Sequence, residues 1–146
     1  MVLVSATPYF PAQARSFQRN FSEAMLGPVE MNLMRQRHKG GERQIQQLFA
    51  QARAFADSYD DVNFTPPRLS TIQIPTLLVC GDRDPLCPVS LASEMRIAIP
   101  RSYLWVVPNG GHGPIFGDAA PRFAETALAF LRGDWAAQLS SGSTVA

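Results

Sequence analysis

The sequence of 146 residues has little net charge, few cysteines and no long apolar run. A formal net charge of +1 gives no electrostatic reason to expect nucleic acid or an anionic membrane surface as a partner. The two cysteines, Cys80 and Cys87, are too few and too unpatterned for a disulfide framework or a structural zinc site. No apolar segment approaches the ~20 residues that a membrane-spanning helix needs. We therefore expect no nucleic-acid partner and no membrane span.

The apolar content of the chain indicates a folded protein. Hydrophobic residues make up 46% of the sequence, which is enough for a buried core and excludes a disordered chain. Residues 1–6 have no basic region before their short apolar stretch, so they do not fit the pattern of a signal peptide. Cys80 lies in an apolar run and is expected to be a small buried side chain. We accordingly expect a reduced, cytoplasmic protein.

Hydrophobic patterning predicts four segments. Residues 1–11 are predicted to form a first core strand and a proline-containing loop. Residues 12–70 are predicted to form helices, and residues 71–135 alternate strand, helix, strand and helix. Such alternation is typical of parallel strands joined by crossover helices. Residues 136–146, rich in Ser, Gly and Thr, are predicted to be a flexible tail.

Within these segments, spacing and breaker residues predict the individual elements. Apolar side chains at every third or fourth position predict helices over about 12–26, 29–38 and 45–59. Continuous apolar runs predict buried strands at 76–80 and 103–107. Helices are expected to follow these two strands, over about 90–99 and 118–131.

Polar residues follow both predicted strands of the second half. The loop after residues 76–80 contains Asp82 and Asp84, and the loop after 103–107 contains His112. Because the strands are sequential and parallel, we expect their carboxyl ends, where ligands bind in open α/β sheets, to lie side by side. A carboxylate beside a histidine fixes its tautomer and stabilises the imidazolium, which suits a general base. Alternatively, Asp84 closes a turn before a proline and His112 is a solvated loop residue, while Asp82 is expected to support the turn.

Two segments resemble the α/β-hydrolase fold family. Residues 74–88, which contain Gly-Asp-Arg-Asp-Pro, resemble its acid-bearing strand and loop, and residues 99–112 resemble its last strand and histidine loop. The second aspartate of that pattern is usually the family's triad acid, which corresponds to Asp84. The histidine after the Gly-Gly pair corresponds to His112, and the order of acid before histidine also agrees. The resemblance therefore implies catalytic roles for Asp84 and His112.

The same resemblance implies a fold class for the whole chain. The first predicted strand would be the family's sixth, and the helical segment 12–70 would be a cap inserted before the acid-bearing strand. We predict an α/β fold: a truncated α/β-hydrolase with about three parallel strands, flanking helices and a helical cap segment. The sequence contains no Gly-x-Ser-x-Gly turn and no recognisable oxyanion loop, so we expect the nucleophile-bearing half to be absent.

Three residues are candidates for a substitute nucleophile: Ser5, Thr7 and Cys87. Ser5, at the end of the first predicted strand, would lie near the site. A nucleophilic hydroxyl must lie on an exposing turn within reach of its base, and the sequence does not mark any of the three in this way. The alternative is that His112, oriented by Asp84, activates a water molecule directly.

The resemblance implies an enzyme that hydrolyses carboxylic esters of small apolar molecules, in the manner of an esterase or lipase. It implies no metal and no organic cofactor. The alternative is a catalytically inactive hydrolase fragment that binds small molecules or is a remnant. An incomplete sheet exposes an apolar edge, and such edges favour association. We therefore predict a homo-oligomer, most simply a dimer joined along the exposed sheet edge or through the cap helices.

Overall fold

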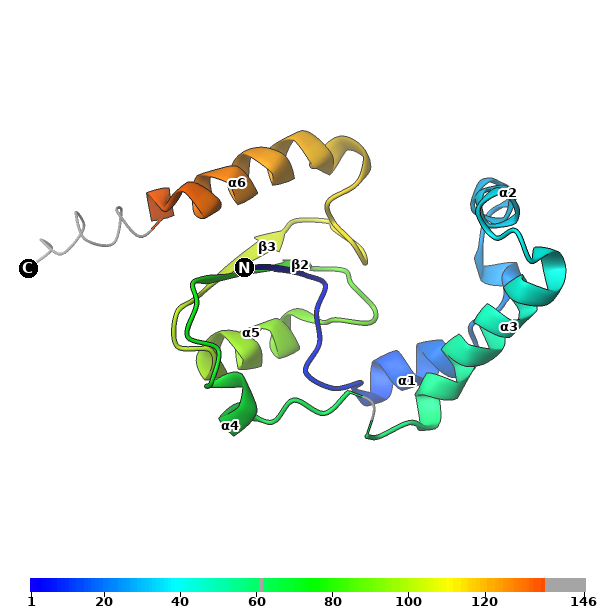
Figure 1. Cartoon of the computed structure of the whole chain (residues 1–146), viewed down its shortest axis with the longest axis horizontal. Coiled ribbons are helices and arrows are strands. Elements are labelled where there is room, and N and C mark those ends of the chain that lie inside the picture. Colours follow the sequence, from blue (N-terminus) through cyan, green and yellow to red (C-terminus); the bar gives the residue numbers. More distant parts are fainter. Residues whose placement is uncertain (61, 136–146) are drawn as a thin grey trace, which may run out of the picture. The chain divides into compact units, whose positions relative to one another are not determined.

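The computed structural model describes residues 1–60 and 62–135, and the predicted flexible tail, 136–146, lies outside them (Figure 1). The described chain divides into two compact units. The sheet unit contains Met1–Pro8 and the chain from Phe64 onward, and the helical unit is Tyr9–Asn63. No helix among the described residues has the length and apolar character that crossing a membrane requires.

Within the described residues, the sheet unit is built on three parallel strands in the order β1–β2–β3. They are β1 (Val2–Val4), β2 (Thr76–Gly81) and β3 (Ser102–Val107). Every residue of β2 is buried, as expected for a central strand that is covered on both faces. The predicted α/β fold with parallel strands is confirmed.

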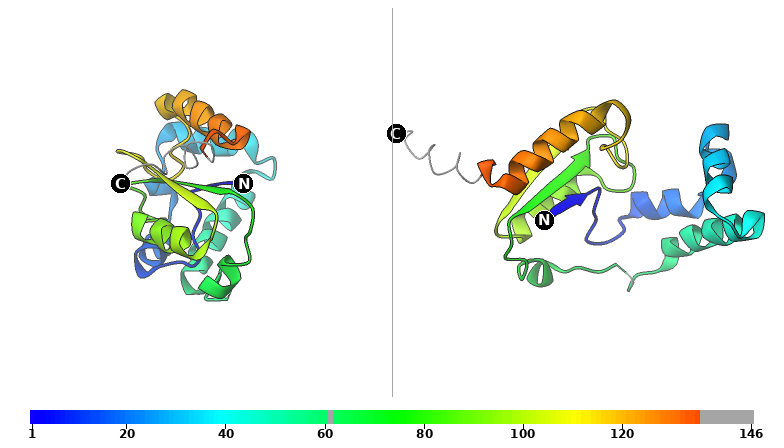
Figure 2. Two further views of the ribbon diagram at one scale, coloured as in Figure 1. Left: turned by 90° about the vertical axis from the view of Figure 1, so that its left-hand side faces the viewer. Right: turned by 45° about the horizontal axis from the view of Figure 1, so that its top comes forward.

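Helices cover both faces of this sheet (Figure 2). On one face Leu78 packs with residues of α4 (Pro66–Leu69) and with Met95 of α5 (Val89–Ala98). On the other face Leu77 and Val79 pack with Phe130 of α6 (Ala120–Arg132). Successive residues of a strand point to opposite faces, so β2 supplies both core clusters. The short helix α4 lies within the segment 12–70 that is predicted to be helical, but none of the individually predicted helices includes it.

The helical unit contains α1 (Ala12–Arg19), α2 (Pro28–Arg37) and α3 (Gly41–Ala54). Met31 of α2 packs with Ile45 and Phe49 of α3 in its core. A first helix running to residue 26 is wrong, because α1 ends at Arg19. The side-chain amide of Asn20 donates to the Ser16 carbonyl oxygen at 2.9 Å. Asparagine side chains that bond to the backbone in this way compete with helical hydrogen bonds, which favours a helix end here. Single 3₁₀ turns follow at Glu23–Met25 and, after α3, at Phe55–Asp57.

The helical unit is shorter than the predicted cap-like segment. It ends at Asn63, whereas the prediction extends to residue 70, and α4 belongs to the sheet unit. Its role as a cap stays a prediction.

Candidate active site

Two loops meet where β2 and β3 end, at the carboxyl edge of the sheet. A Cβ atom added at Gly81, the last residue of β2, would lie 2.1 Å from the carbonyl oxygen of Gly110. Only glycine permits this approach, because any side chain would overlap the backbone of the second loop. The Arg83 N–H donates to the Gly110 carbonyl at 2.9 Å, and the Asp82 N–H donates to the Val107 carbonyl at 3.2 Å. The backbone itself therefore joins the acid loop to the histidine loop.

Asp84 is held in the acid loop by its own turn. Its side chain is 0% exposed, and its Oδ1 accepts hydrogen bonds from the backbone N–H of Leu86 at 2.8 Å and of Cys87 at 2.9 Å. An aspartate that accepts from the backbone two or three residues later stabilises a tight turn. Asp84 therefore does stabilise a turn, as the alternative interpretation expects. The same turn fixes the direction of its carboxylate.

The structure brings Asp84 together with His112. The His112 Nδ1 atom lies 3.0 Å from Asp84 Oδ2 and 3.2 Å from Asp84 Oδ1. A carboxylate only accepts hydrogen bonds, so this contact places the imidazole proton on Nδ1 and leaves the Nε2 lone pair unprotonated. The His112 side chain is 50% exposed while its partner is buried. The pair can therefore accept a proton from a group that approaches from solvent.

Ser5 connects β1 to both loops. Its Oγ accepts the N–H of Gly113 at 3.0 Å, and its carbonyl oxygen accepts the Cys87 thiol at 2.9 Å. The backbone of Ser5 has a positive φ of 46°, which ends the first strand earlier than the predicted residue 6. A non-glycine residue in this conformation is costly and marks functional or strained sites in many proteins. Ser5 is thus the candidate hydroxyl that lies against the histidine loop.

The other two candidate nucleophiles are Cys87 and Thr7. Burial, followed by the Asp84 carboxylate and Cys80, raises the pKa of the Cys87 thiol to about 12. Because the thiolate is the nucleophilic form, this raised pKa argues against Cys87 as a nucleophile at neutral pH. Burial also raises the pKa of Cys80, with further contributions from Asp84 and Asp82. Thr7 is partly buried in the segment that follows β1.

The sequence does not single out Gly81 and Gly110, which join the two loops, and it names Ser5 only as a candidate nucleophile near the site. Gly81 and Gly110 decide how closely the two loops approach, and Ser5 fastens the histidine loop to β1. A glycine at the end of a buried strand is a signal for close approach of backbone, so Gly81 was within reach of sequence reasoning. The contact of Ser5 with Gly113 spans 108 residues and has no local signal.

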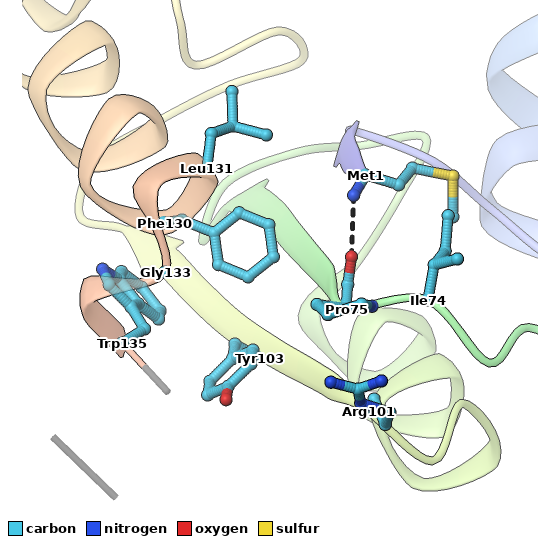
Figure 3. A pocket seen from close by; sticks show the side chains of 9 residues that line it. All are labelled: Met1, Ile74, Pro75, Arg101, Tyr103, Phe130, Leu131, Gly133 and Trp135. Atoms are coloured by element: carbon cyan, nitrogen blue, oxygen red, sulfur yellow. Dashed lines mark hydrogen bonds between the residues drawn. The ribbon is translucent and has the colours of Figure 1, made fainter. Parts of the chain in front are cut away.

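A cavity of about 260 Å³ lies at the opposite edge of the sheet, where the strands begin (Figure 3). Its lining is mostly apolar, with three aromatic rings in edge-to-face contact and the Met1 ammonium donating to the Pro75 carbonyl at 2.7 Å. The lining residues are Met1, Ile74, Pro75, Arg101, Tyr103, Phe130, Leu131, Gly133 and Trp135. Because the strands are parallel, this cavity and the Asp84–His112 pair lie at opposite ends of them.

Residues 5–119 match the family model of the alpha/beta hydrolase fold. Among solved structures, an esterase from Rhodococcus sp. ECU1013 (RhEst1) is 20% identical with a TM-score of 0.55, over 90% of this chain and 55% of that chain. A meta-cleavage product hydrolase from Pseudomonas fluorescens IP01 (CumD) is 16% identical with a TM-score of 0.55, over 92% of this chain and 56% of that chain. At these identities the likeness is one of fold.

The chain spans little more than half the length of these two structures. A comparison with curated proteins gave no match.

Proposed function

Because the chain belongs to the α/β-hydrolase fold family, we propose that it hydrolyses carboxylic esters, with His112 as the general base and Asp84 orienting it. The observation that carries this proposal is the 3.0 Å contact between His112 Nδ1 and a buried Asp84 oxygen. A partly exposed imidazole on a buried carboxylate is the arrangement that general-base catalysis requires. The substrate class we expect is a small apolar ester.

The two residues have distinct tasks in this reaction. His112 Nε2 takes the proton of the attacking hydroxyl or water as the tetrahedral intermediate forms. Asp84 then faces an imidazolium, whose positive charge the buried carboxylate stabilises. In collapse of the intermediate, His112 returns the proton to the leaving alcohol. No metal is required for these steps.

Two routes differ in the attacking group. In the first, the Ser5 hydroxyl attacks the ester, the alcohol leaves, and the acyl-serine is then hydrolysed by a water molecule that His112 activates; the place of Ser5 beside the histidine loop supports this route. In the second, His112 activates a water molecule and no covalent intermediate arises. A burst of alcohol release that depends on Ser5 distinguishes the first route from the second, because only an acyl-enzyme accumulates.

The experiment is hydrolysis of short p-nitrophenyl esters by the purified chain and two variants. We expect His112→Ala to reduce kcat/KM by at least about 100-fold, the usual contribution of a general base. Asp84→Asn should also reduce it strongly, because an amide cannot stabilise the imidazolium. Asp82→Asn is the matched control, since this carboxylate lies exposed in the same loop. Absence of hydrolysis, or hydrolysis unchanged in His112→Ala, would refute the proposal.

A second candidate function is binding of a small apolar molecule without catalysis, and the cavity at the strand beginnings favours it. Apolar walls with few polar groups are typical of ligand pockets. Leu131 lines the cavity and is 62% exposed, so Leu131→Glu introduces a charge there at little cost to folding. Quenching of tryptophan fluorescence by a short-chain fatty ester should weaken in this variant. If hydrolysis is absent and this quenching is present, the binding function is favoured.

We also propose a homodimer and a reducing compartment. Within the described residues β1 pairs with β2 alone, so its other edge can accept a strand from a second copy. Exchange of helices from the helical unit is the other route to a dimer. Light scattering that gives a monomer at working concentration would refute both routes. Two buried free thiols, Cys80 and Cys87, agree with a cytoplasmic location.

A further inference from the structure

Three side chains of different chemistry converge at the carboxyl edge of the sheet. One ligating atom each from Asp84, Cys87 and His112 lies within 4.8 Å of the other two. Asp84 and Cys87 belong to one turn, three residues apart, and His112 comes from the neighbouring loop. Of these three side chains, the proposed catalysis uses only Asp84 and His112, so the thiol of Cys87 beside them has no part in it.

We propose that Asp84, Cys87 and His112 form a binding site for a divalent transition-metal ion of borderline softness, with Zn²⁺ as the representative. Thiolate, imidazole and carboxylate are the ligands that Zn²⁺ uses in proteins, whereas Mg²⁺ and Ca²⁺ select oxygen ligands alone. Three protein ligands leave the fourth tetrahedral position to water or another small molecule. The site is therefore open, and the partly exposed imidazole lies on its solvent side.

Two of the ligands are positioned in advance. Asp84 Oδ1 accepts the N–H groups of Leu86 and Cys87, and Oδ2, which faces His112 Nδ1, becomes available to an ion once that nitrogen has lost its proton. Cys87 is 4% exposed, and its Sγ lies 2.9 Å from the Ser5 carbonyl oxygen. Zn²⁺ bond lengths of about 2.0–2.3 Å place tetrahedral ligands about 3–4 Å apart, so the widest pair must approach by about 1 Å. His112, with a half-exposed side chain, has the freedom to make that movement.

Binding rearranges two protons. The Cys87 thiol loses its proton to solvent as the sulfur–metal bond forms. His112 coordinates through Nδ1, which lies 3.0 Å from Asp84, so its proton moves to Nε2. One proton is released for each ion bound, and Nε2 no longer has a lone pair with which to accept another. The ion therefore blocks the general base, a consequence that rests on the proposed function, whereas binding itself does not.

Co²⁺ added to the purified chain tests binding without any substrate. We expect one equivalent of Co²⁺ to produce thiolate-to-cobalt absorption and intense tetrahedral d–d bands. Zn²⁺ should then displace Co²⁺ and abolish both. Cys87→Ser and His112→Gln should each weaken Zn²⁺ affinity by at least about 10-fold in calorimetric titration, the lower limit for loss even of an outer partner. Cys80→Ala is the matched control, because this second buried thiol lies outside the cluster.

Spectra without a thiolate band, or bands that persist in Cys87→Ser or vanish in Cys80→Ala, would overturn the site. Circular dichroism of each variant establishes that loss of binding is not loss of fold. A second experiment tests inhibition, with each protein compared with its own metal-free rate. Zn²⁺ should suppress ester hydrolysis by the native chain and should suppress it less in Cys87→Ser. If the chain has no hydrolytic activity, the cobalt spectra still decide the metal site.

Discussion

The sheet unit and the helical unit differ in the interactions that hold each unit together internally. In the sheet unit, the elements that carry the site are joined backbone to backbone, through the β2–β3 ladder and through the contact of Gly81 with Gly110. In the helical unit, the side chain of Arg15 joins segments that are distant in sequence through hydrogen bonds to their carbonyl oxygens. Arg15 is 7% exposed although it is charged.

The contacts of Arg15 explain how a buried cation is tolerated. Its Nε donates to the Phe10 carbonyl at 2.9 Å, and its Nη1 donates to the carbonyls of Ala56 at 2.8 Å and Ser58 at 2.7 Å. These last carbonyls belong to the turn that ends the long helix, where the helix dipole favours positive charge. The guanidinium also lies 3.8 Å from the centroid of the Tyr59 ring.

Each unit is therefore vulnerable to a different kind of substitution. Positions set by backbone contacts tolerate changes of surface side chains but not the addition of a Cβ at a point of close approach. Positions set by one side chain fail when that side chain is removed. Substitutions that change one point of contact at a time test this contrast.

The largest effect is expected from Gly81→Ala. The new Cβ would lie 2.1 Å from the Gly110 carbonyl oxygen, and backbone must move to relieve the overlap. Overpacking costs about 1–3 kcal/mol, and we expect the upper end, about 3 kcal/mol, because both partners are backbone. Urea unfolding gives this free energy. Gly111→Ala is the matched control, since a Cβ there would meet no described atom within 4 Å; an equal loss in both variants would contradict the role of close approach.

Arg15→Met is expected to have the next largest effect, confined to the helical unit. Methionine retains the apolar stem but makes none of the hydrogen bonds that Arg15 donates to the carbonyls of Phe10, Ala56 and Ser58. At about 1 kcal/mol for each lost hydrogen bond, the cost is about 2–3 kcal/mol. Hydrogen exchange should accelerate at the amides of α3 and not at those of β2.

The control for Arg15→Met is Arg19→Met. Arg19 pairs with Asp57 at 2.8 Å, but both side chains are more than half exposed. Exposed ion pairs contribute little, so we expect no measurable change in exchange. Acceleration in β2 by Arg15→Met would show that the two units do not respond separately.

Substitutions of Ser5 are expected to change stability less, and two of them separate the loss of a hydrogen bond from the cost of its backbone conformation. Ser5→Ala removes the acceptor of the Gly113 N–H but keeps a Cβ at a φ of 46°. Ser5→Gly removes the same acceptor and relieves the backbone cost of the left-handed conformation, about 1 kcal/mol. We therefore expect Ser5→Gly to be more stable than Ser5→Ala by about 1 kcal/mol in urea unfolding. Equal stability would mean that the backbone at Ser5 carries no strain.

These contrasts also show what could be predicted from sequence. The strands 76–80 and 103–107 and the loops beyond them follow from apolar runs that end in Gly, Asp and Pro, which are local signals. The contact of Asp84 with His112 follows because parallel neighbouring strands place their carboxyl ends together. Their catalytic roles stay a prediction.

Long-range side-chain contacts had no such signal. Arg15 lies in an amphipathic helix, and its charge favours a solvated position, yet it is buried through carbonyls some 41 residues away. The sequence names Cys87 only as a candidate nucleophile, and its place beside Asp84 and His112 depends on how two loops fold together. Sequence patterns report on burial and turns, whereas such clusters depend on tertiary packing.

The remaining expected effect is an alkaline loss of stability that originates in the sheet unit, where both cysteines lie. Burial raises the pKa of Cys87 to about 12 from an ordinary value of 9.0. Below pH 9.0 the thiol is protonated in folded and unfolded chains alike, and its contribution to stability is complete. Between pH 9.0 and about 12 only the unfolded chain ionises, so this contribution is lost as pH rises. Urea unfolding at pH 8 and pH 10.5 should therefore show a smaller decline in Cys87→Ala than in the native chain, and an identical decline would mean that the thiol is not shielded from water in the folded protein.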